Sequence, residues 1–241
     1  MSKLICIRHA QASFGAADYD QLSDLGYTQS AHLGDYMAGT VMKIDKVYIG
    51  PLKRHRQTFE TVRTSYEKLG QTLPKPEILA GLAEHRGPEI LRQSMPQLID
   101  AFPEVRAWHQ DTENHPERKV KNHFKVFNFF MKRWATNDLG LDLPDEHQDW
   151  KSFKAEVSKA IDTILADRAK GITSAAFTSG GTISAIMGYA LDMHDDARII
   201  GMNDSVINTS ISEFKYSDSR ISLHRFNLTP HLHTEELITY V

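Results

Sequence analysis

The segment L-I-C-I-R-H-A-Q, residues Leu4 to Gln11, carries the strongest structural signal in this chain. Its first four residues are an unbroken apolar run, which is typical of a strand buried on both faces of a sheet. The run ends directly in a guanidinium and an imidazole side chain. In parallel sheets, binding sites form at the carboxyl ends of the strands. The segment therefore predicts a buried strand that presents Arg8 and His9 at one sheet edge.

Beyond this segment, apolar runs of strand length alternate with amphipathic segments of helix length. Residues 47–49 and 175–177 predict two further strands, and residues 207–216 and 221–226 predict a late hairpin. Three predicted helices are marked by an N-cap serine or a terminal glycine: Ser23 to Gly39, Phe59 to Gly70 and Phe153 to Gly171. A fourth is predicted over residues Thr182 to Leu191. This alternation predicts an α/β fold, a three-layer αβα sandwich with a mostly parallel central sheet.

The segment from about Glu84 to Trp150 interrupts this alternation. It is rich in His, Asp, Glu and Pro, it has no clear strand pattern, and it holds at least one helix, from Phe124 to Trp134. We expect a single domain over residues 1–241, in which residues 88–150 form a helical cap insertion over the sheet. Exposed aromatic side chains of that helix are compatible with a homodimer.

Composition excludes several classes of protein. The 241 residues include 28 Lys and Arg against 31 Asp and Glu, a net charge of −3, so no basic surplus favours nucleic acid. The single cysteine, Cys6, excludes intrachain disulfides and cysteine-based zinc clusters and fits a reducing cytoplasm. The longest uncharged window, residues 171–191, is polar and glycine-rich at its centre, and no export signal is visible. We expect a cytoplasmic protein without nucleic-acid or membrane partners.

Three predicted strand ends carry residues that suit an anion. The first strand ends in Arg8-His9, and the second is followed by Lys53-Arg54. The third is followed by residues 178–181, Thr-Ser-Gly-Gly, where free backbone N–H groups at a helix start would face an anion. Arginine is the preferred side chain for bidentate phosphate recognition. Because the carboxyl ends of parallel strands meet at one edge of a sheet, these segments predict a common anion-binding site.

Four short motifs occur in the same order and at the same separation as in a known family. They are Arg8-His9-Ala10, Leu22-Ser23-x-x-Gly26-x-x-Gln29, Pro51-Leu52-x-Arg54-x-x-Gln57-Thr58 and Leu82-Ala83-Glu84. With them, residues 3–215 resemble the histidine phosphatase superfamily, the phosphoglycerate mutase-like proteins. The resemblance implies phosphoryl transfer through a histidine, with no metal and no cofactor.

Carried over residue by residue, the resemblance implies a role for each matched position. His9 is the expected nucleophile; its ring must be neutral when it attacks, so its other nitrogen should donate to a backbone carbonyl or a similar acceptor. Arg8 and Arg54 are expected to clamp the phosphoryl oxygens of a small phosphorylated substrate. Glu84 is the expected general acid and then general base, with Glu89 as a nearby competitor. The expected phosphate-binding set is completed by Gln11, Ser179 and Gly180.

Ser179 stands where the superfamily usually has a second histidine. A serine hydroxyl donates a hydrogen bond but brings no charge, and charge-assisted hydrogen bonds contribute about 1.5–3 kcal/mol against about 1 kcal/mol for neutral ones. The exchange therefore predicts chemistry that is weaker by roughly ten-fold, not abolished. Ala10 replaces the usual glycine, which is tolerable only where its φ is negative.

Two other interpretations remain open. Ser179 on a strand-to-helix turn, followed by Asp204 and His224, is compatible with a serine hydrolase, although the residue two positions earlier is not the glycine that this motif needs. A non-enzymatic phospho-ligand sensor would explain the loss of the second histidine. It would leave the retained His9 and Glu84 unexplained, because binding alone needs neither a nucleophile nor a proton donor.

Within the superfamily the choice lies between a phosphatase and a mutase. The glycolytic mutases continue after the first motif with an Asn-bearing stretch and a Gly-Trp segment, and residues 14–21 here contain neither. The resemblance thus favours a phosphate monoester hydrolase, with a phosphoglycerate mutase-type phosphomutase or a catalytically weak phospho-ligand-binding relative as alternatives. Several basic residues of the insertion suit either an anionic substrate or a solvated face: Arg92, His109, His115, Arg118 and Lys121.

Overall fold

The computed structural model describes residues 1–13, 19–40, 43–143, 147–166, 171–217 and 220–240. Parts of four predictions lie outside the described residues: 14–18 of the run after the first motif, 144–146 of the insertion, 167–170 before Gly171, and 218–219 of the hairpin turn. The elements and contacts below belong to the described ranges.

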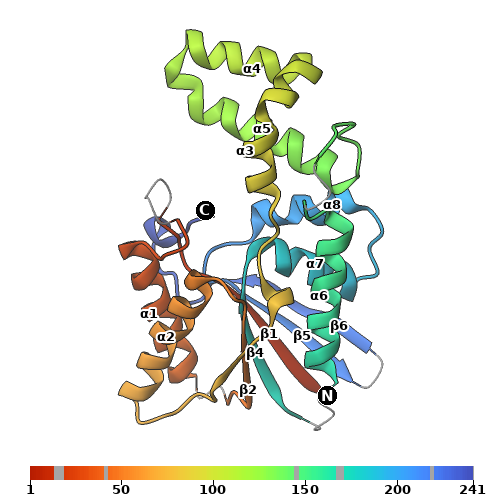
Figure 1. Cartoon of the computed structure of the whole chain (residues 1–241). Coiled ribbons are helices and arrows are strands. Elements are labelled where there is room, and N and C mark those ends of the chain that lie inside the picture. Colours follow the sequence, from red (N-terminus) through yellow and green to blue (C-terminus); the bar gives the residue numbers. More distant parts are fainter. Residues whose placement is uncertain (14–18, 41–42, 144–146, 167–170, 218–219, 241) are drawn as a thin grey trace.

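A six-stranded sheet forms the centre of the fold (Figure 1). Its order is β3-β2-β4-β1-β5-β6, and the strand bounds are Ser2–Arg8 (β1), Lys46–Ile49 (β2), Pro76–Ile78 (β3), Thr173–Thr178 (β4), Ile211–Ser217 (β5) and Arg220–Leu228 (β6). Strands β1 to β4 pair in parallel, whereas β5 runs antiparallel to β1 and to β6. This mostly parallel sheet confirms the predicted α/β fold, and β1 is a central strand.

Helices cover both faces of the sheet (Figure 1). Ile5 and Ile7 of β1 enter the core beneath α1 and α2, whereas Leu4 and Cys6 enter the core shared with α6, α7 and α8. Alternate residues of one run thus fill two separate cores, so every residue of the run has to be apolar. The bounds of these helices are Asp24–Gly39 (α1), Lys53–Lys68 (α2), Trp150–Leu165 (α6), Gly180–Ala190 (α7) and Asp196–Met202 (α8).

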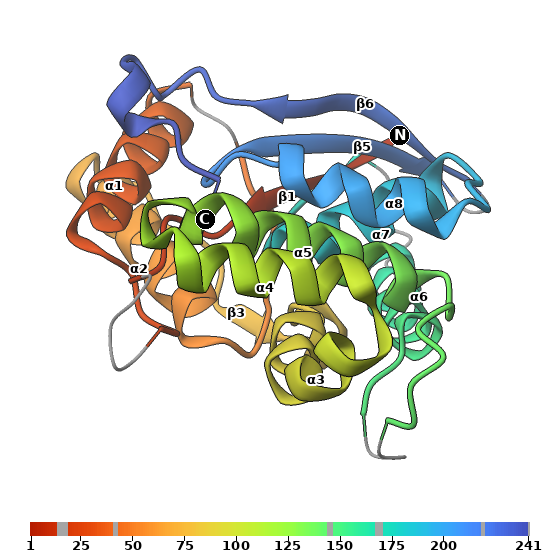
Figure 2. The ribbon, with the colours of Figure 1, turned by 90° about the horizontal axis from the view of Figure 1, so that it is seen from above.

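Three further helices stand beyond the carboxyl ends of β1 and β4 (Figures 1 and 2). Trp134, in the last of these three helices, packs on Trp150 of α6 with ring centres 5.8 Å apart. Both residues belong to one hydrophobic core, which joins the last of the three helices to α6. Neither these helices nor any other in the described ranges is long and apolar enough to span a membrane. The bounds are Gly87–Ala101 (α3), Pro103–Asn114 (α4) and Lys119–Ala135 (α5), and short 3₁₀ helices occupy Ala80–Leu82 (η1), Pro116–Arg118 (η2), Asn203–Ser205 (η3) and Glu235–Leu237 (η4).

Polar side chains begin two of the long helices. Ser23 accepts the backbone N–H of Gly26 at 3.0 Å and caps α1, as the sequence predicts. Asp149 accepts the backbone N–H of Ser152 at 2.6 Å and caps α6. Each cap satisfies a backbone donor that the first helical turn leaves without an intrahelical partner.

Gly26 lies in the first turn of α1 against the loop that follows β1. A Cβ there would overlap the carbonyl oxygen of Gln11, whereas a Cβ at Gly39, on the same helix, would meet no atom within 4 Å. We expect Gly26→Ala to lower the free energy of unfolding by about 1–3 kcal/mol. Gly39→Ala should leave it unchanged or raise it by up to about 1 kcal/mol. Urea unfolding measures both, and equal effects of the two substitutions would contradict this prediction.

Candidate active site

The carboxyl ends of β1 and β4 lie side by side. Arg8 pairs with Thr178 in the parallel register, and the backbone N–H of His9 donates to the carbonyl of Thr178 at 2.8 Å. His9 and Ser179, the next residues along the chain, therefore share one edge of the sheet. On the other side of β4, β2 leads into α2, which carries Arg54 in its first turn. The three segments that suit an anion thus meet at one edge.

His9 is buried, with 3% of its surface exposed, and both ring nitrogens have partners. Nε2 lies 3.1 Å from Nε of Arg54, and Nδ1 lies 2.7 Å from the carbonyl oxygen of Ala10. A guanidinium only donates, so Nε2 must accept and Nδ1 must carry the proton that it donates to Ala10. Burial, followed by the charges of Arg54, Arg8 and His55, lowers the pKa of His9 well below 6.5. The ring is therefore neutral at neutral pH and offers an unprotonated Nε2.

Arg54 is held by a carboxylate that the sequence analysis did not identify. Its Nη1 donates to Oδ1 of Asp20 at 2.8 Å, and its guanidinium lies 5.5 Å from the ring centre of Tyr19. The other carboxylate oxygen of Asp20 accepts the backbone N–H of Lys53 at 2.8 Å, at the start of α2. Asp20 thus fixes both the helix start and the orientation of the guanidinium, and it leaves Nε directed at His9.

Arg8 is a second buried guanidinium at the same edge. One of its terminal nitrogens donates to the carbonyl of Val206, and the other donates to the carbonyl of Tyr240 at 2.8 Å. Nε has no hydrogen-bond partner among the described residues. Burial lowers the pKa of Arg8 to about 10, and the charge of Glu84 opposes that shift. A buried guanidinium bonded mainly to carbonyls favours an anion beside it, because a buried charge is costly unless it is paired.

Two residues before β5 fix the backbone of the Arg8-His9 pair. The side-chain amide of Asn208 donates to the carbonyl of His9 at 3.0 Å, and the backbone N–H of Thr209 donates to the carbonyl of Arg8 at 3.1 Å. Thr209 has a φ of +60°, which is unusual for a β-branched residue, and its hydroxyl lies 2.8 Å from Nε2 of His231. Neither residue belongs to the motifs identified in the sequence, although both hold the backbone of the Arg8-His9 pair.

The motif residues of α1 and α2 hold the loop that follows His9. The N–H of Ala10 donates to the hydroxyl of Thr58 at 3.1 Å, and the N–H of Gln11 donates to the side chain of Gln29 at 2.9 Å. Ala10 is not among the described residues with a positive φ, which meets the condition for replacing glycine there. The side-chain oxygen of Gln11 accepts the hydroxyl proton of Ser23 at 2.8 Å, so Gln11 lies at the start of α1.

Glu84 lies at the amino end of α7, next to the arginine site. Its two oxygens accept the backbone N–H groups of Gly181 at 3.3 Å and of His85 at 3.0 Å. A Cβ on Gly181 would overlap the Glu84 carboxylate, and a Cβ on Gly180 would lie 3.5 Å from the guanidinium carbon of Arg8. Glycine at position 181 therefore lets the acid approach the helix start, whereas the guanidinium would be at an ordinary contact distance from a Cβ at position 180.

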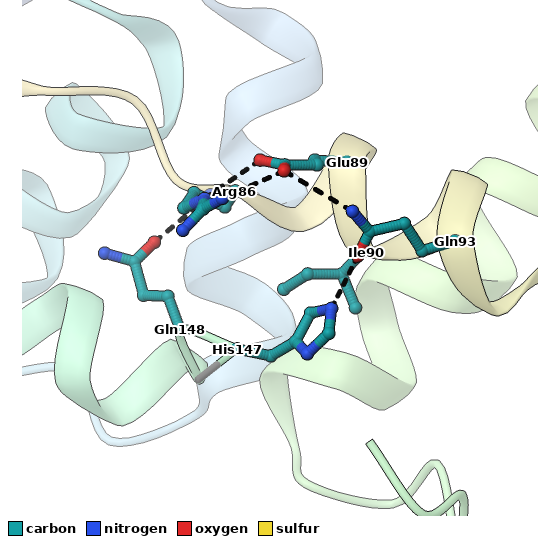
Figure 3. A pocket seen from close by; sticks show the side chains of 6 residues that line it. All are labelled: Arg86, Glu89, Ile90, Gln93, His147 and Gln148. Carbon is teal, nitrogen blue, oxygen red and sulfur yellow. Dashed lines mark hydrogen bonds and ion pairs between the residues drawn. The ribbon is translucent and has the colours of Figure 1, made fainter. Parts of the chain in front are cut away.

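Glu89, the competing acid, takes part in a surface network instead. Both of its oxygens accept hydrogen bonds from Arg86 at 2.9 Å, and Figure 3 shows this pair lining a pocket with Gln93, His147 and Gln148. Arg118, one of the insertion's basic residues, also forms an ion pair at the surface, with Asp111 at 2.8 Å. Of the two acids, Glu84 is the one that lies at the strand ends with His9.

Ser179 is fully buried, and its hydroxyl lies 2.7 Å from Nε2 of His55. His224, the base that a serine hydrolase would need, lies exposed on the edge strand β6. Asp204 lies in η3, close enough to Arg8 for that charge to oppose the rise that burial causes in the pKa of Asp204. The structure therefore does not bring Ser179, Asp204 and His224 together as a triad. It joins Ser179 to His55, a residue to which the sequence motifs assign no role.

The family model of the histidine phosphatase superfamily (branch 1) matches residues 4–128 and 124–229. None of the curated proteins compared with the chain is significantly similar to it.

Solved structures share the fold at low sequence identity. YhfR of Bacillus stearothermophilus is 16% identical, with a TM-score of 0.66 over 96% of this chain and 99% of that one. A phosphoserine phosphatase mutant of Entamoeba histolytica, in complex with phosphoserine, is 16% identical, with a TM-score of 0.61 over 96% and 100%. A phosphoglycerate mutase of Bacillus anthracis is 15% identical, with a TM-score of 0.59 over 95% and 94%. The similar structures thus include a phosphatase and a mutase.

Proposed function

This chain belongs to the histidine phosphatase superfamily, and from that premise we propose that it is a phosphate monoester hydrolase that acts through a phosphohistidine at His9. The observation that carries the proposal is the state of His9. Its ring is neutral, its Nδ1 proton is bound to the Ala10 carbonyl, and its Nε2 faces Arg54 beside a second buried guanidinium, Arg8. A neutral nucleophile between two fixed cations suits attack on a phosphate dianion.

In the first half-reaction, the lone pair on Nε2 of His9 forms a bond to phosphorus while the bond to the leaving oxygen breaks. Arg54 turns its Nε from the imidazole to a phosphoryl oxygen. Arg8 offers its Nε, for which the described part of the chain holds no hydrogen-bond partner, so two cations neutralise the charge on the phosphoryl group. Protonated Glu84 gives its proton to the leaving oxygen. In the second half-reaction, ionised Glu84 takes a proton from water, whose oxygen attacks phosphorus and releases His9 and inorganic phosphate.

We assign the rest of substrate recognition to residues 88–150 as a cap, because α3 to α5 stand over the strand ends that carry His9 and Arg8 (Figure 2). We assign phosphate binding to Arg8, Arg54, Ser179, Gly180 and Gln11, and the side chain of Gln11 also contacts Ser23. Hydrolysis is favoured over a mutase activity because residues 14–21 lack the Asn-bearing and Gly-Trp segments of the glycolytic mutases. The substrate is a small phosphate monoester.

The test is to trap the phosphoenzyme. The protein is mixed with radiolabelled phosphoserine or 4-nitrophenyl phosphate, quenched in denaturant and digested. We expect a label that acid removes and base does not, on the peptide that contains His9, together with release of inorganic phosphate. Transfer of the label to added phosphoglycerate, in place of phosphate release, would support a mutase. Binding of the esters without label or turnover would contradict the proposal and favour a phospho-ligand sensor.

Arg54 both binds phosphate and lowers the pKa of His9 in this proposal. Arg54→Met should lower kcat/KM by about 10²–10³, because a charged donor to the transition state is lost. With that cation removed, the pKa of His9 rises towards its ordinary value, so the ring is protonated at a higher pH and the acid limb of kcat/KM moves to higher pH. NMR titration of the His9 ring and pH–rate profiles measure both effects. The exposed Arg56, on the same helix, provides the control Arg56→Met; similar losses in both variants would contradict the role of Arg54.

A further inference from the structure

His55 is a fully buried histidine that the two half-reactions above do not use. It follows Arg54 in the first turn of α2, and its ring centre lies 5.6 Å from that of His9. Its Nε2 lies 2.7 Å from the hydroxyl oxygen of Ser179. Its Nδ1 side lies against the backbone of Gly50, where a Cβ would overlap the ring. The imidazole therefore fills the space between the end of β2 and the hydroxyl at the end of β4.

We propose that His55 is a positioning residue that directs the Ser179 hydroxyl at the phosphoryl group, so that the two side chains together replace the histidine expected at position 179. The inference rests on the proposed function. When Nε2 of His55 carries a proton and donates it to the Ser179 oxygen, the single hydroxyl proton of Ser179 is free to donate to a phosphoryl oxygen. The opposite arrangement, in which Ser179 donates to His55, would leave the hydroxyl no proton for the substrate.

The surroundings of the pair favour the first arrangement once an anion is present. Ser179 begins α7, and the phosphoryl group at His9 would lie at that same strand edge. A dianion there attracts the hydroxyl proton of Ser179, which favours the neutral tautomer of His55 that carries its proton on Nε2. In the absence of an anion, burial and the charge of Arg54 lower the pKa of His55 well below 6.5, so the pair begins neutral. The Ser179 hydroxyl thus donates to an anionic acceptor, a charge-assisted hydrogen bond that needs no additional proton on the pair.

The substitution Ser179→His restores the residue that the superfamily usually has at position 179, so the simplest expectation is a gain of activity. Packing predicts a loss instead. His55 and Ser179 each expose 0% of their surface, so a second imidazole at position 179 has no room beside the first. Introduced alone, Ser179→His should impair the enzyme. Combined with His55→Ala, which empties the neighbouring space, the same substitution should place an imidazole close to the phosphoryl site.

The experiment compares His55→Ala, His55→Gln, Ser179→Ala, Ser179→His and the exchange variant His55→Ala/Ser179→His with the wild type. Steady-state kinetics use 4-nitrophenyl phosphate, a quenched assay follows label on His9, and urea unfolding checks each fold. We expect His55→Ala and Ser179→Ala each to lower kcat by about 10- to 100-fold with little change in KM, because an oriented donor to the transition state is lost. His55→Gln, which keeps an N–H donor, should retain most of the activity.

The exchange variant provides the strictest comparison. Its kcat should exceed that of His55→Ala by at least about ten-fold, whereas the kcat of Ser179→His alone should lie below that of the wild type. Wild-type rates of labelling and turnover in folded His55→Ala, or a loss in His55→Gln as large as that in His55→Ala, would overturn the inference and leave the proposed function intact. The absence of label on wild-type His9 would overturn both. If His55→Ala does not fold, the kcat of His55→Gln is compared with that of Ser179→Ala. A clearly higher kcat for His55→Gln supports the inference, and equal losses overturn it.

Discussion

Replacement of His9 by alanine should abolish the phosphoenzyme and lower kcat by about 10⁴-fold or more. The expectation follows from the chemistry of covalent catalysis, in which removal of the nucleophile costs nearly as much as removal of the whole catalytic group. Arg8 and Arg54 would remain and could still bind a phosphate ester, so KM should change far less than kcat. Quenched labelling and steady-state kinetics with the same phosphate monoester measure the two quantities.

The control for this variant is His194→Ala, because His194 is exposed beyond α7. It should label and turn over as the wild type does. Urea unfolding of His9→Ala distinguishes a lost nucleophile from a lost fold. Label that persists in folded His9→Ala, on Ser179 or any other residue, would contradict the phosphohistidine mechanism and revive the serine hydrolase interpretation.

Replacement of Glu84 by glutamine should produce an effect that depends on the leaving group. Gln keeps one side-chain oxygen, which can accept the N–H of either His85 or Gly181, but its amide is too weak an acid to protonate a leaving oxygen. With phosphoserine, whose alkoxide leaves poorly, we expect kcat to fall by about 10²–10⁴-fold. With 4-nitrophenyl phosphate, the first half-reaction needs little proton donation. We therefore expect a rapid burst of nitrophenolate followed by slow turnover, because in the proposed mechanism Glu84 is also the base that activates water.

The matched control for Glu84 is Glu89→Gln. Glu89 is bound to Arg86 at the surface, so its loss should change kcat by no more than a few-fold (Figure 3). Stopped-flow measurement of the burst and steady-state rates with both substrates test the pair. Equal losses with both leaving groups and no burst would contradict the acid–base role of Glu84. If kcat fell as far in Glu89→Gln as in Glu84→Gln, the result would contradict the assignment of the acid–base role to Glu84 in place of Glu89.

Much of the fold could be predicted because it depends on local patterns. The apolar run from Leu4 to Ile7 predicts a strand that is buried on both of its faces. The structure agrees, because β1 contributes side chains to a hydrophobic core on each side of the sheet. The capping role of Ser23 could also be predicted, because it involves a neighbour only three residues away. The strand β3 and the helix α8 were not predicted. They span three and seven residues, too few for a periodic pattern, and β3 forms because β2 offers it a free edge.

The candidate site, like the fold, could be predicted from the sequence only in part. The sequence by itself determined which residue types end the strands, and so indicated a cationic edge with His9, Arg8 and Arg54. Only the tertiary structure decided which side chains complete it, because these contacts join residues far apart along the chain. His55 meets Ser179 across 124 positions, and Arg8 meets Tyr240 across 232. Such pairs leave no local pattern, since their separation is set by the order of strands in the sheet. The tautomer of His9 was likewise settled by a guanidinium that the fold brings to it from α2.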